Sequence, residues 1–117
     1  MRLRADIFVS AYIRRCAVEG AYAVLRRRGA AEAGAIFVKV DRLDGTCALY
    51  GPAPQTELAE AGIDRVWRRV HDQELIDPAS AEERLRREIA FDPDIWIVEV
   101  EDRQGRHFLD LAGQEGG

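Results

Sequence analysis

The sequence predicts an α+β fold, with an antiparallel sheet of about four to five strands, an N-terminal helix and a second helix before the last main strand. Two stretches carry apolar side chains at helical spacing, shorter stretches alternate apolar and polar residues, and an Asp-Gly pair separates two of these. We expect both helices on one face of the sheet. The 117 residues suit one domain, which we place at 1–112, followed by a flexible tail at 113–117.

The first half of the chain is predicted to form one helix and then strands. We place the helix at residues 6–18, because apolar side chains recur there every four residues and Gly20 follows. These side chains are Phe8, Tyr12 and Cys16. Residues 21–28 fit either a short helix or a strand, and we favour the strand. Alternating apolar side chains predict the next strand at 36–40.

A tight turn joins this strand to its successor. Asp44 and Gly45 are typical of a hairpin turn, because glycine tolerates the positive φ that such a turn needs. The returning strand is expected around residues 47–50. A loop follows, with one helical turn near residues 57–61, and the alternation over 65–71 predicts another strand.

The second helix has a start signal in the sequence. Ser80 and Glu83 have the spacing of a capping box, in which each side chain satisfies a backbone N–H at the helix start. We expect Glu82 to face water and Ala90 or Phe91 to join the buried stripe.

The last main strand follows a strong helix stop. Asp92 and Pro93 end the second helix, since proline restricts the residue before it and has no N–H to donate. Residues 95–98 are apolar on both faces, which favours a central strand. We expect residues 107–109 to add a short final strand.

Composition excludes several classes of protein. Hydrophobic residues make up 47% and charged residues 32% of the chain, so we expect a packed core, and a disordered chain is excluded. No apolar run approaches the roughly 18 residues of a membrane helix, and no signal-peptide pattern follows the N-terminus. The two cysteines are too few for a disulfide scaffold or a four-ligand zinc site. We therefore expect a cytoplasmic protein without membrane contact, cofactor or metal.

The charges are unevenly distributed. Residues 1–42 carry a balance of +5 and residues 43–117 a balance of −9. Such asymmetry indicates a polyanion-binding surface, an acidic tail, or two faces that attract each other across a subunit contact. Sixteen of the seventeen basic residues are arginine, a side chain that can make bidentate contacts to phosphate or carboxylate. The alternative interpretation is that this excess reflects the codon usage of a GC-rich genome.

Four stretches carry a resemblance to a known family. They are residues 26–29 (RRRG), 33–38 (AGAIFV), 49–53 (LYGPA) and 91–102 (FDPDIWIVEVED). In this order they resemble an uncharacterised alphaproteobacterial family, the domain of unknown function numbered 1491, over nearly the whole chain. The resemblance implies a stand-alone bacterial cytoplasmic protein. It implies no functional residues, because the family has no assigned activity.

Carboxylates gather around the last main strand. Glu99 and Glu101 are two residues apart on a strand, so both point the same way and could share a metal or a proton. Asp92 and Asp94 precede them. The alternative interpretation is structural: the glutamates line the wet end of a strand opposite arginines, and the aspartates flank a helix stop.

The segment 65–71 mixes basic and aromatic residues. On a strand, alternate side chains share one face, where they could stack on bases or grip phosphates. The binding candidates here are Arg65, Trp67, Arg69 and His71. Arg26 and Arg27, together with Arg28, would extend that surface if 21–28 is a neighbouring strand. The alternative interpretation is that Trp67 covers the edge of the core and the arginines pair with the acidic half of the chain.

The remaining reactive side chains form no recognisable catalytic pattern. His71 and His107 are 36 residues apart, a spacing that matches no metal site. Cys16 and Cys47 lie in apolar stretches and are interpreted as small core side chains. No nucleophilic triad and no glycine-rich phosphate loop is present in the sequence.

Three functional hypotheses follow. The leading one is a small non-catalytic interaction module that forms a homodimer or binds a protein partner, with the opposed charges of its two halves making the complex weaken with salt. The first alternative is nucleic-acid binding through the Arg/Trp strand face, which the acidic pI near 5.2 disfavours. The second is a metal-dependent hydrolase that uses the carboxylates.

Overall fold

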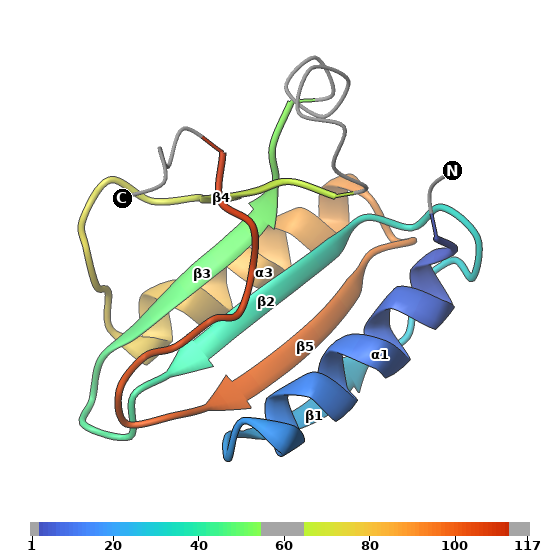
Figure 1. Cartoon of the computed structure of the whole chain (residues 1–117). Coiled ribbons are helices and arrows are strands. Elements are labelled where there is room, and N and C mark those ends of the chain that lie inside the picture. The colour runs from blue at the N-terminus through green and yellow to red at the C-terminus, as the bar shows by residue number, and fades with distance from the viewer. Residues whose placement is uncertain (1–2, 55–64, 113–117) are drawn as a thin grey trace.

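The computed structural model describes residues 3–54 and 65–112 of the chain (Figure 1). Within these residues, the two helices are α1 (Ala5–Val18) and α3 (Pro78–Phe91). The five strands are β1 (Tyr22–Arg27), β2 (Ile36–Asp41), β3 (Cys47–Pro52), β4 (Trp67–Arg69) and β5 (Trp96–Glu101). The expected helical turn at 57–61 and the expected tail at 113–117 lie outside the described residues.

The five strands form one sheet in the order β1-β5-β2-β3-β4. All neighbours are antiparallel except β2 and β5, which run parallel. The α+β class, the mostly antiparallel sheet and the positions of the two helices are thus confirmed. The parallel pair arises because the chain passes from the edge strand β4 through α3 and inserts β5 between β1 and β2, and parallel neighbours need such a long crossover.

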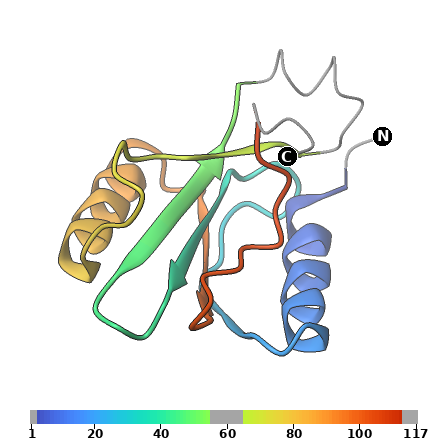
Figure 2. The same cartoon turned by 60° about the vertical axis from the view of Figure 1, so that its left-hand side comes forward.

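The helices cover opposite faces of the sheet, so the expectation that both lie on one face is wrong. Figure 2 shows the sheet nearly edge-on, with α1 and α3 on its two sides. The reason lies in β2 and β5, which are buried on both faces. Val38 and Val98 belong to the core under α1, whereas Phe37 and Ile97 belong to the core under α3. Two apolar faces need two covering layers.

The hairpin between β2 and β3 forms as predicted. Gly45 has a φ of +88°, and the carboxylate of Asp44 accepts hydrogen bonds from the backbone N–H and the hydroxyl of Thr46. Val38 lies opposite Tyr50 across the two strands. The turn therefore sets the register that the alternating sequence requires.

The start of α3 differs from the prediction. The helix begins at Pro78 with Asp77 as its N-cap residue, and the Ser80 hydroxyl donates to the Asp77 carboxylate, so the Ser80–Glu83 capping box is wrong. Proline suits the first helical position, because the N–H it lacks would have no partner there. The helix ends before Asp92 as predicted. Ala90 is exposed and Phe91 is 88% exposed, so the expectation that one of them joins the buried stripe is wrong.

The segment that follows β5 is not a strand at residues 107–109. Residues 103–112 instead run along the α1 face of the sheet (Figures 1 and 2). Phe108 has a φ of 56°, which is incompatible with an extended strand. The segment reaches β4, where the Trp67 N–H donates to the Asp110 carbonyl (2.9 Å) and Trp67 forms an isolated bridge to Leu111.

Candidate functional site

The densest group of charged side chains lies between α3 and the sheet. Glu82 of α3 accepts two hydrogen bonds of 2.8 Å from the guanidinium of Arg26 on β1 and one of 2.8 Å from the Lys39 ammonium on β2. Glu99 of β5 accepts from Arg26 at 3.1 Å and lies 3.8 Å from the Lys39 ammonium. We call these four residues the charge cluster. Glu82 therefore faces the sheet and not water, because the sheet offers it two cations.

Opposite charges shift the ionisation of this cluster. The hydrogen bond from Arg26 lowers the pKa of Glu82 to about 2, with Lys39 acting in the same direction. Burial acts to lower the pKa of Lys39, but Glu82 and Glu99 outweigh it, so the pKa is raised. The cluster holds two cations and two anions that satisfy one another. This arrangement suits stabilisation of the fold, and it leaves Glu99 engaged with two cations.

The carboxylate candidates are not gathered at one point. Asp92 and Asp94 precede β5, where the Asp92 carboxylate accepts the Asp94 N–H at 3.0 Å, whereas Glu101 ends the strand. Seven residues of extended chain span roughly 20 Å. Over the ranges 3–54 and 65–112, no three His, Cys, Asp or Glu side chains are grouped in a way that could hold a metal ion.

The basic-aromatic segment is shorter as a strand than expected and is partly buried. Trp67 is 3% exposed within the core under α1, so its ring is not available for stacking on bases. Arg65 donates to the Leu3 carbonyl at 3.0 Å and lies over the Phe8 ring at 5.2 Å. Arg69 donates to the carbonyls of the turn that follows β4. This geometry is that of a core edge and not of a nucleic-acid platform.

The expected extension of that surface by residues 21–28 is wrong. These residues do form a strand, as predicted, but β1 and β4 are the two opposite edges of the sheet. Arg26 belongs to the charge cluster, and Arg27 donates to the Pro93 carbonyl at 2.7 Å. The two basic segments therefore form no common surface.

The histidines and cysteines do not come together. The Nε2 atom of His71 accepts the Leu49 N–H at 3.0 Å, and its Nδ1 atom lies 2.8 Å from the Gln73 carbonyl. Both ring nitrogens thus contact backbone groups, and burial lowers the pKa of His71. Cys16 lies in the core under α1, and Cys47 is also fully buried. Burial raises the pKa of the Cys47 thiol to about 11, which makes it a poor nucleophile at neutral pH.

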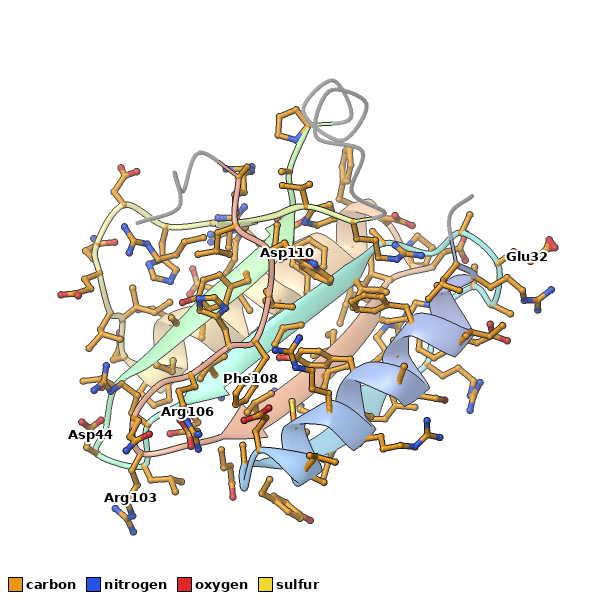
Figure 3. The ribbon with its side chains drawn as sticks, in the orientation of Figure 1. Glu32, Asp44, Arg103, Arg106, Phe108 and Asp110 are labelled. Carbon is orange, nitrogen blue, oxygen red and sulfur yellow. The ribbon has the colours of Figure 1, made fainter. Side chains whose placement is uncertain are left out.

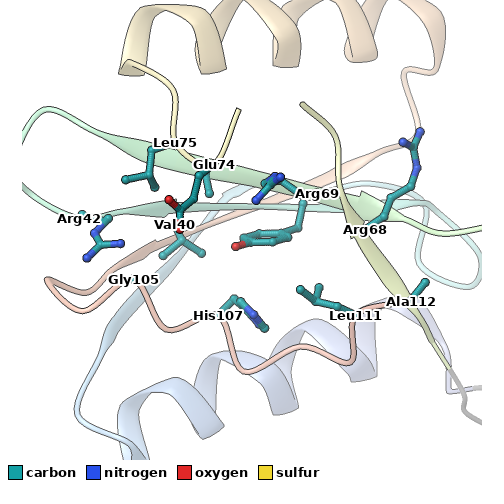
Figure 4. A pocket seen from close by; sticks show the side chains of 12 residues that line it. Val40, Arg42, Arg68, Arg69, Glu74, Leu75, Gly105, His107, Leu111 and Ala112 are labelled. Atoms are coloured by element: carbon teal, nitrogen blue, oxygen red, sulfur yellow. The ribbon is translucent and has the colours of Figure 1, made fainter. Parts of the chain in front are cut away.

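The sequence did not reveal a pocket of about 400 Å³ on the α1 face. Its lining comes from β2, β3 and β4, from the segments that follow β2 and β4, and from the segment 103–112. It includes Arg42, Tyr50, Arg69 and His107 (Figure 4). Of these, only Arg69 was a sequence candidate. The one available signal was the excess of arginine, which says nothing about which arginines meet.

A second surface feature lies at the opposite edge of the sheet. A groove between α1 and β1 has a mixed lining, in which apolar side chains such as Ile7, Ile13 and Leu25 lie beside the charged side chains of Asp6, Arg14 and Arg28. Ile7 is 50% and Leu25 is 37% exposed, and Tyr22 of β1 is 62% exposed. Apolar side chains are therefore concentrated along β1, the edge that has α1 beside it.

Comparison with known proteins identifies the family of the chain. Residues 3–110 match the family described as "Protein of unknown function (DUF1491)", so the chain belongs to that family and the resemblance seen in the sequence is confirmed. No curated protein matches the chain. In the described part of the chain, no helix is long and apolar enough to span a membrane.

Solved structures of relatives share the fold. A crystal structure of a DUF1491 family protein from Caulobacter crescentus CB15 has 39% sequence identity and a TM-score of 0.78, with 97% of this chain and 100% of that chain covered. The solution structure of protein Atu0922 from A. tumefaciens has 36% identity and a TM-score of 0.82, with 98% of each chain covered. The chain is thus similar to proteins of the same size.

Three of the stretches that carry the family resemblance meet at the start of β5. A Cβ atom at Gly29 or Gly34 would overlap the Asp94 carbonyl oxygen, so both positions need glycine for close packing. The Trp96 ring N–H donates to the Ala30 carbonyl at 2.8 Å. These stretches therefore serve the packing of the loop between β1 and β2 and identify no catalytic site.

Proposed function

We propose that this protein is a non-catalytic interaction module that forms a homodimer through the outer edge of β1. The observation that carries the proposal is the difference between the two edges of the sheet. Outside β4, Trp67 exchanges backbone hydrogen bonds with Asp110 and Ala112, so that edge is covered. In the described ranges, no backbone hydrogen bond joins the outer side of β1 to another segment.

The composition of β1 favours pairing with another strand. Charged side chains usually protect an exposed edge from pairing. Here Arg26 and Arg27 are the only charged residues of β1, and both are bonded back to their own chain. The four residues before them, 22–25, are uncharged and exposed or half-buried. An uncharged edge with unpaired backbone groups is a template for strand addition.

The geometry of β1 supports a second copy as the partner. In a two-fold antiparallel pair, facing residues point to the same side of the sheet, so one residue faces its own copy. With Val24 on the axis, Ala23 faces Leu25 of the second copy on the α1 side. The bulge between Leu25 and Arg27 ends the regular stretch. Pairing over residues 22–26 would join the two sheets into one.

The expected salt dependence of the complex changes on this basis. The opposed charges of the two halves of the chain pair internally in the charge cluster, where Arg26 and Lys39 meet Glu82 and Glu99. They are therefore not needed for an intermolecular contact. A dimer held by β1 backbone hydrogen bonds and apolar side chains is expected to persist in high salt.

The first test is the mass of the protein in solution. Sedimentation equilibrium should give twice the 13.2 kDa of one chain at both low and high salt. Val24→Lys should shift the equilibrium to the monomer, because two lysines would face each other across the axis. Val18→Lys is the matched control: Val18 is 79% exposed at the end of α1 and is not one of the paired residues 22–26.

A cross-link gives a test that does not depend on loss of stability. Val24→Cys should form a disulfide dimer under mild oxidation, because facing Cα atoms in an antiparallel pair lie about 4.5–5.5 Å apart. Val18→Cys should stay monomeric under the same conditions. The two native cysteines are buried and should not compete. A monomer at every salt concentration, together with no Val24→Cys cross-link, would contradict the proposal.

A further inference from the structure

The pocket on the α1 face lies at the β4 side of the sheet, away from the proposed β1 contact. Figure 4 shows Arg42, Glu74 and Arg69 along one side of this pocket and His107 and Leu111 along the other. Arg68 points away from this group. The pocket has a volume of about 400 Å³, which suits a small organic molecule.

Arg42 has donors with no acceptor in the structure. Its guanidinium makes no hydrogen bond or ion pair to any residue in the described part of the chain, and its Nε–H is buried without a partner. The side chain packs against Gly105, where a Cβ atom would lie 3.0 Å from Nη1. Gly105 has a φ of +72°, so glycine both permits this backbone and leaves room for the guanidinium. Buried donors without partners usually indicate a missing acceptor.

Arg69 adds a second fixed cation. Its Nε and Nη2 atoms donate to the carbonyls of His71 (3.1 Å) and Asp72 (3.3 Å), which are neutral acceptors. No carboxylate forms an ion pair with Arg69 in the described part of the chain, and these two bonds hold its guanidinium in place. Burial raises the pKa of Tyr50, and the charges of Arg69 and Arg42 act in the opposite direction. Both guanidinium groups thus lie close enough to influence the Tyr50 hydroxyl.

Two neutral donors complete the lining. The Nδ1 atom of His107 accepts the Leu109 N–H at 2.9 Å, so the ring proton of the neutral imidazole is on Nε2. Burial lowers the pKa of His107, which favours this neutral form. The His107 ring lies 5.0 Å from the Tyr50 ring, and the Tyr50 hydroxyl has no hydrogen-bond partner among the described residues. His107 and Tyr50 therefore add neutral donors to the two arginines.

We infer that this pocket binds the carboxylate or phosphate group of a small organic anion, with Arg42 and Arg69 as its charged ligands. Glu74 is the one acidic side chain in the lining, and it forms no ion pair with either arginine in the described structure, so the local balance is positive. A planar guanidinium can contact two oxygens of either group. Val40 and Leu75 supply an apolar surface for the rest of the ligand.

The test is a titration of the full-length ¹⁵N-labelled protein followed by NMR. Inorganic phosphate is added in one series and succinate in another, each to about 10 mM against sodium chloride of equal ionic strength, which detects a Kd near 1 mM. Saturable shifts of the Arg42 side-chain Nε–H and of the Tyr50 and His107 backbone amides are expected. Shifts with phosphate alone, with succinate alone or with both identify the ligand group, and each supports the inference.

Charge-matched variants separate a site from general attraction of anions. Arg42→Gln and Arg69→Gln should each weaken binding about tenfold or more, as expected for loss of a charge-assisted hydrogen bond. Arg103→Gln is the control, because Arg103 is exposed at the turn after β5 and extends away from the pocket (Figure 3). Glu74→Gln should bind at least as tightly as the wild type. No saturable shift with either anion, or equal weakening by Arg103→Gln and Arg42→Gln, would overturn the inference.

Discussion

Removing the carboxylate of Glu82 is the most informative perturbation of the fold. Glu82→Gln keeps the size of the side chain but removes one of the two anions that Arg26 and Lys39 share. Lys39 is only 5% exposed, so its ammonium cannot recover full hydration and keeps only Glu99, at 3.8 Å. An uncompensated buried charge is costly, so we expect a clear loss of stability.

The pKa of Glu82 sets the size of this loss. The interactions in the folded state lower the pKa from 4.5 to about 2, and at about 1.4 kcal/mol per unit this corresponds to about 3 kcal/mol. Because 31% of the Glu82 side chain is exposed, solvent screening reduces this value, and we expect about 2 kcal/mol at pH 7. The folded pKa is the lower one, so the contribution is present above the unfolded value of 4.5 and is lost as the pH falls through about 2. About two-fifths of it should remain at pH 3.

Urea unfolding at pH 7 and pH 3 measures this effect directly. The difference in unfolding free energy between wild type and Glu82→Gln should shrink from about 2 kcal/mol at pH 7 to below about 1 kcal/mol at pH 3. Glu83→Gln is the control on the same helix, because the Glu83–Arg87 pair is 2.9 Å long but well exposed and should contribute about 0.5 kcal/mol or less. If Glu82→Gln matched Glu83→Gln at pH 7, or if its difference from wild type were the same at both pH values, the reasoning would be refuted.

Three further predictions concern the core, the hairpin and the thiols. Trp96→Ala should lower the unfolding free energy in urea by about 3–5 kcal/mol, because Trp96 is 1% exposed; a cost below about 1 kcal/mol would show that the ring is not a core element. Gly45→Val should lower the free energy of unfolding by roughly 1–3 kcal/mol, measured by thermal melting. The cause is backbone strain at φ +88° alone, since no atom beyond Gly45 and its chain neighbours lies within 4 Å of the added Cβ, and an unchanged melting temperature would contradict this turn conformation. Burial raises the pKa of both Cys16 and Cys47, so a thiol reagent at pH 7 should label neither thiol in the native protein and both in urea. Fast labelling of the native protein would mean that one of the thiols is accessible.

The charge cluster changes the meaning of the uneven charge distribution. From the sequence, the basic first half and acidic second half suggested an external partner. In the structure, Arg26 and Glu82 are 56 residues apart in the chain and form a bidentate pair between β1 and α3. The asymmetry is therefore used, at least in this cluster, to hold the second half of the chain against the first.

Local signals predicted the elements well. The four-residue recurrence over α1, the Asp44-Gly45 turn and the stop at Asp92-Pro93 all act within a few residues, and the helix, the hairpin and the helix end are confirmed. The two-sided apolar character of residues 95–98 correctly predicted a central strand. Because residues 95–98 are apolar on both faces, both faces of the sheet must also be covered. The expectation that both helices lie on one face did not take this into account.

The candidate site was less accessible to such reasoning. Trp67 and Arg69 lie two residues apart on β4 and so share one face of the strand. Trp67 is nevertheless buried in the core under α1, whereas Arg69 lines a pocket. Which of these occurs depends on the segment 103–112, which lies across the same face of the sheet. No spacing within residues 65–71 contains that information.

From the sequence alone, backbone preferences and side-chain periods of a few residues predicted both helices, the β2–β3 hairpin and the central strand β5, because those choices are local. The order of the strands, the parallel insertion of β5 and the meeting of Arg42, Tyr50, Arg69 and His107 in one pocket emerge only in the folded chain. These arrangements depend on burial of both faces of the central strands and on pairing of charges far apart in the chain. Their energies do not depend on sequence separation, so no local pattern records them.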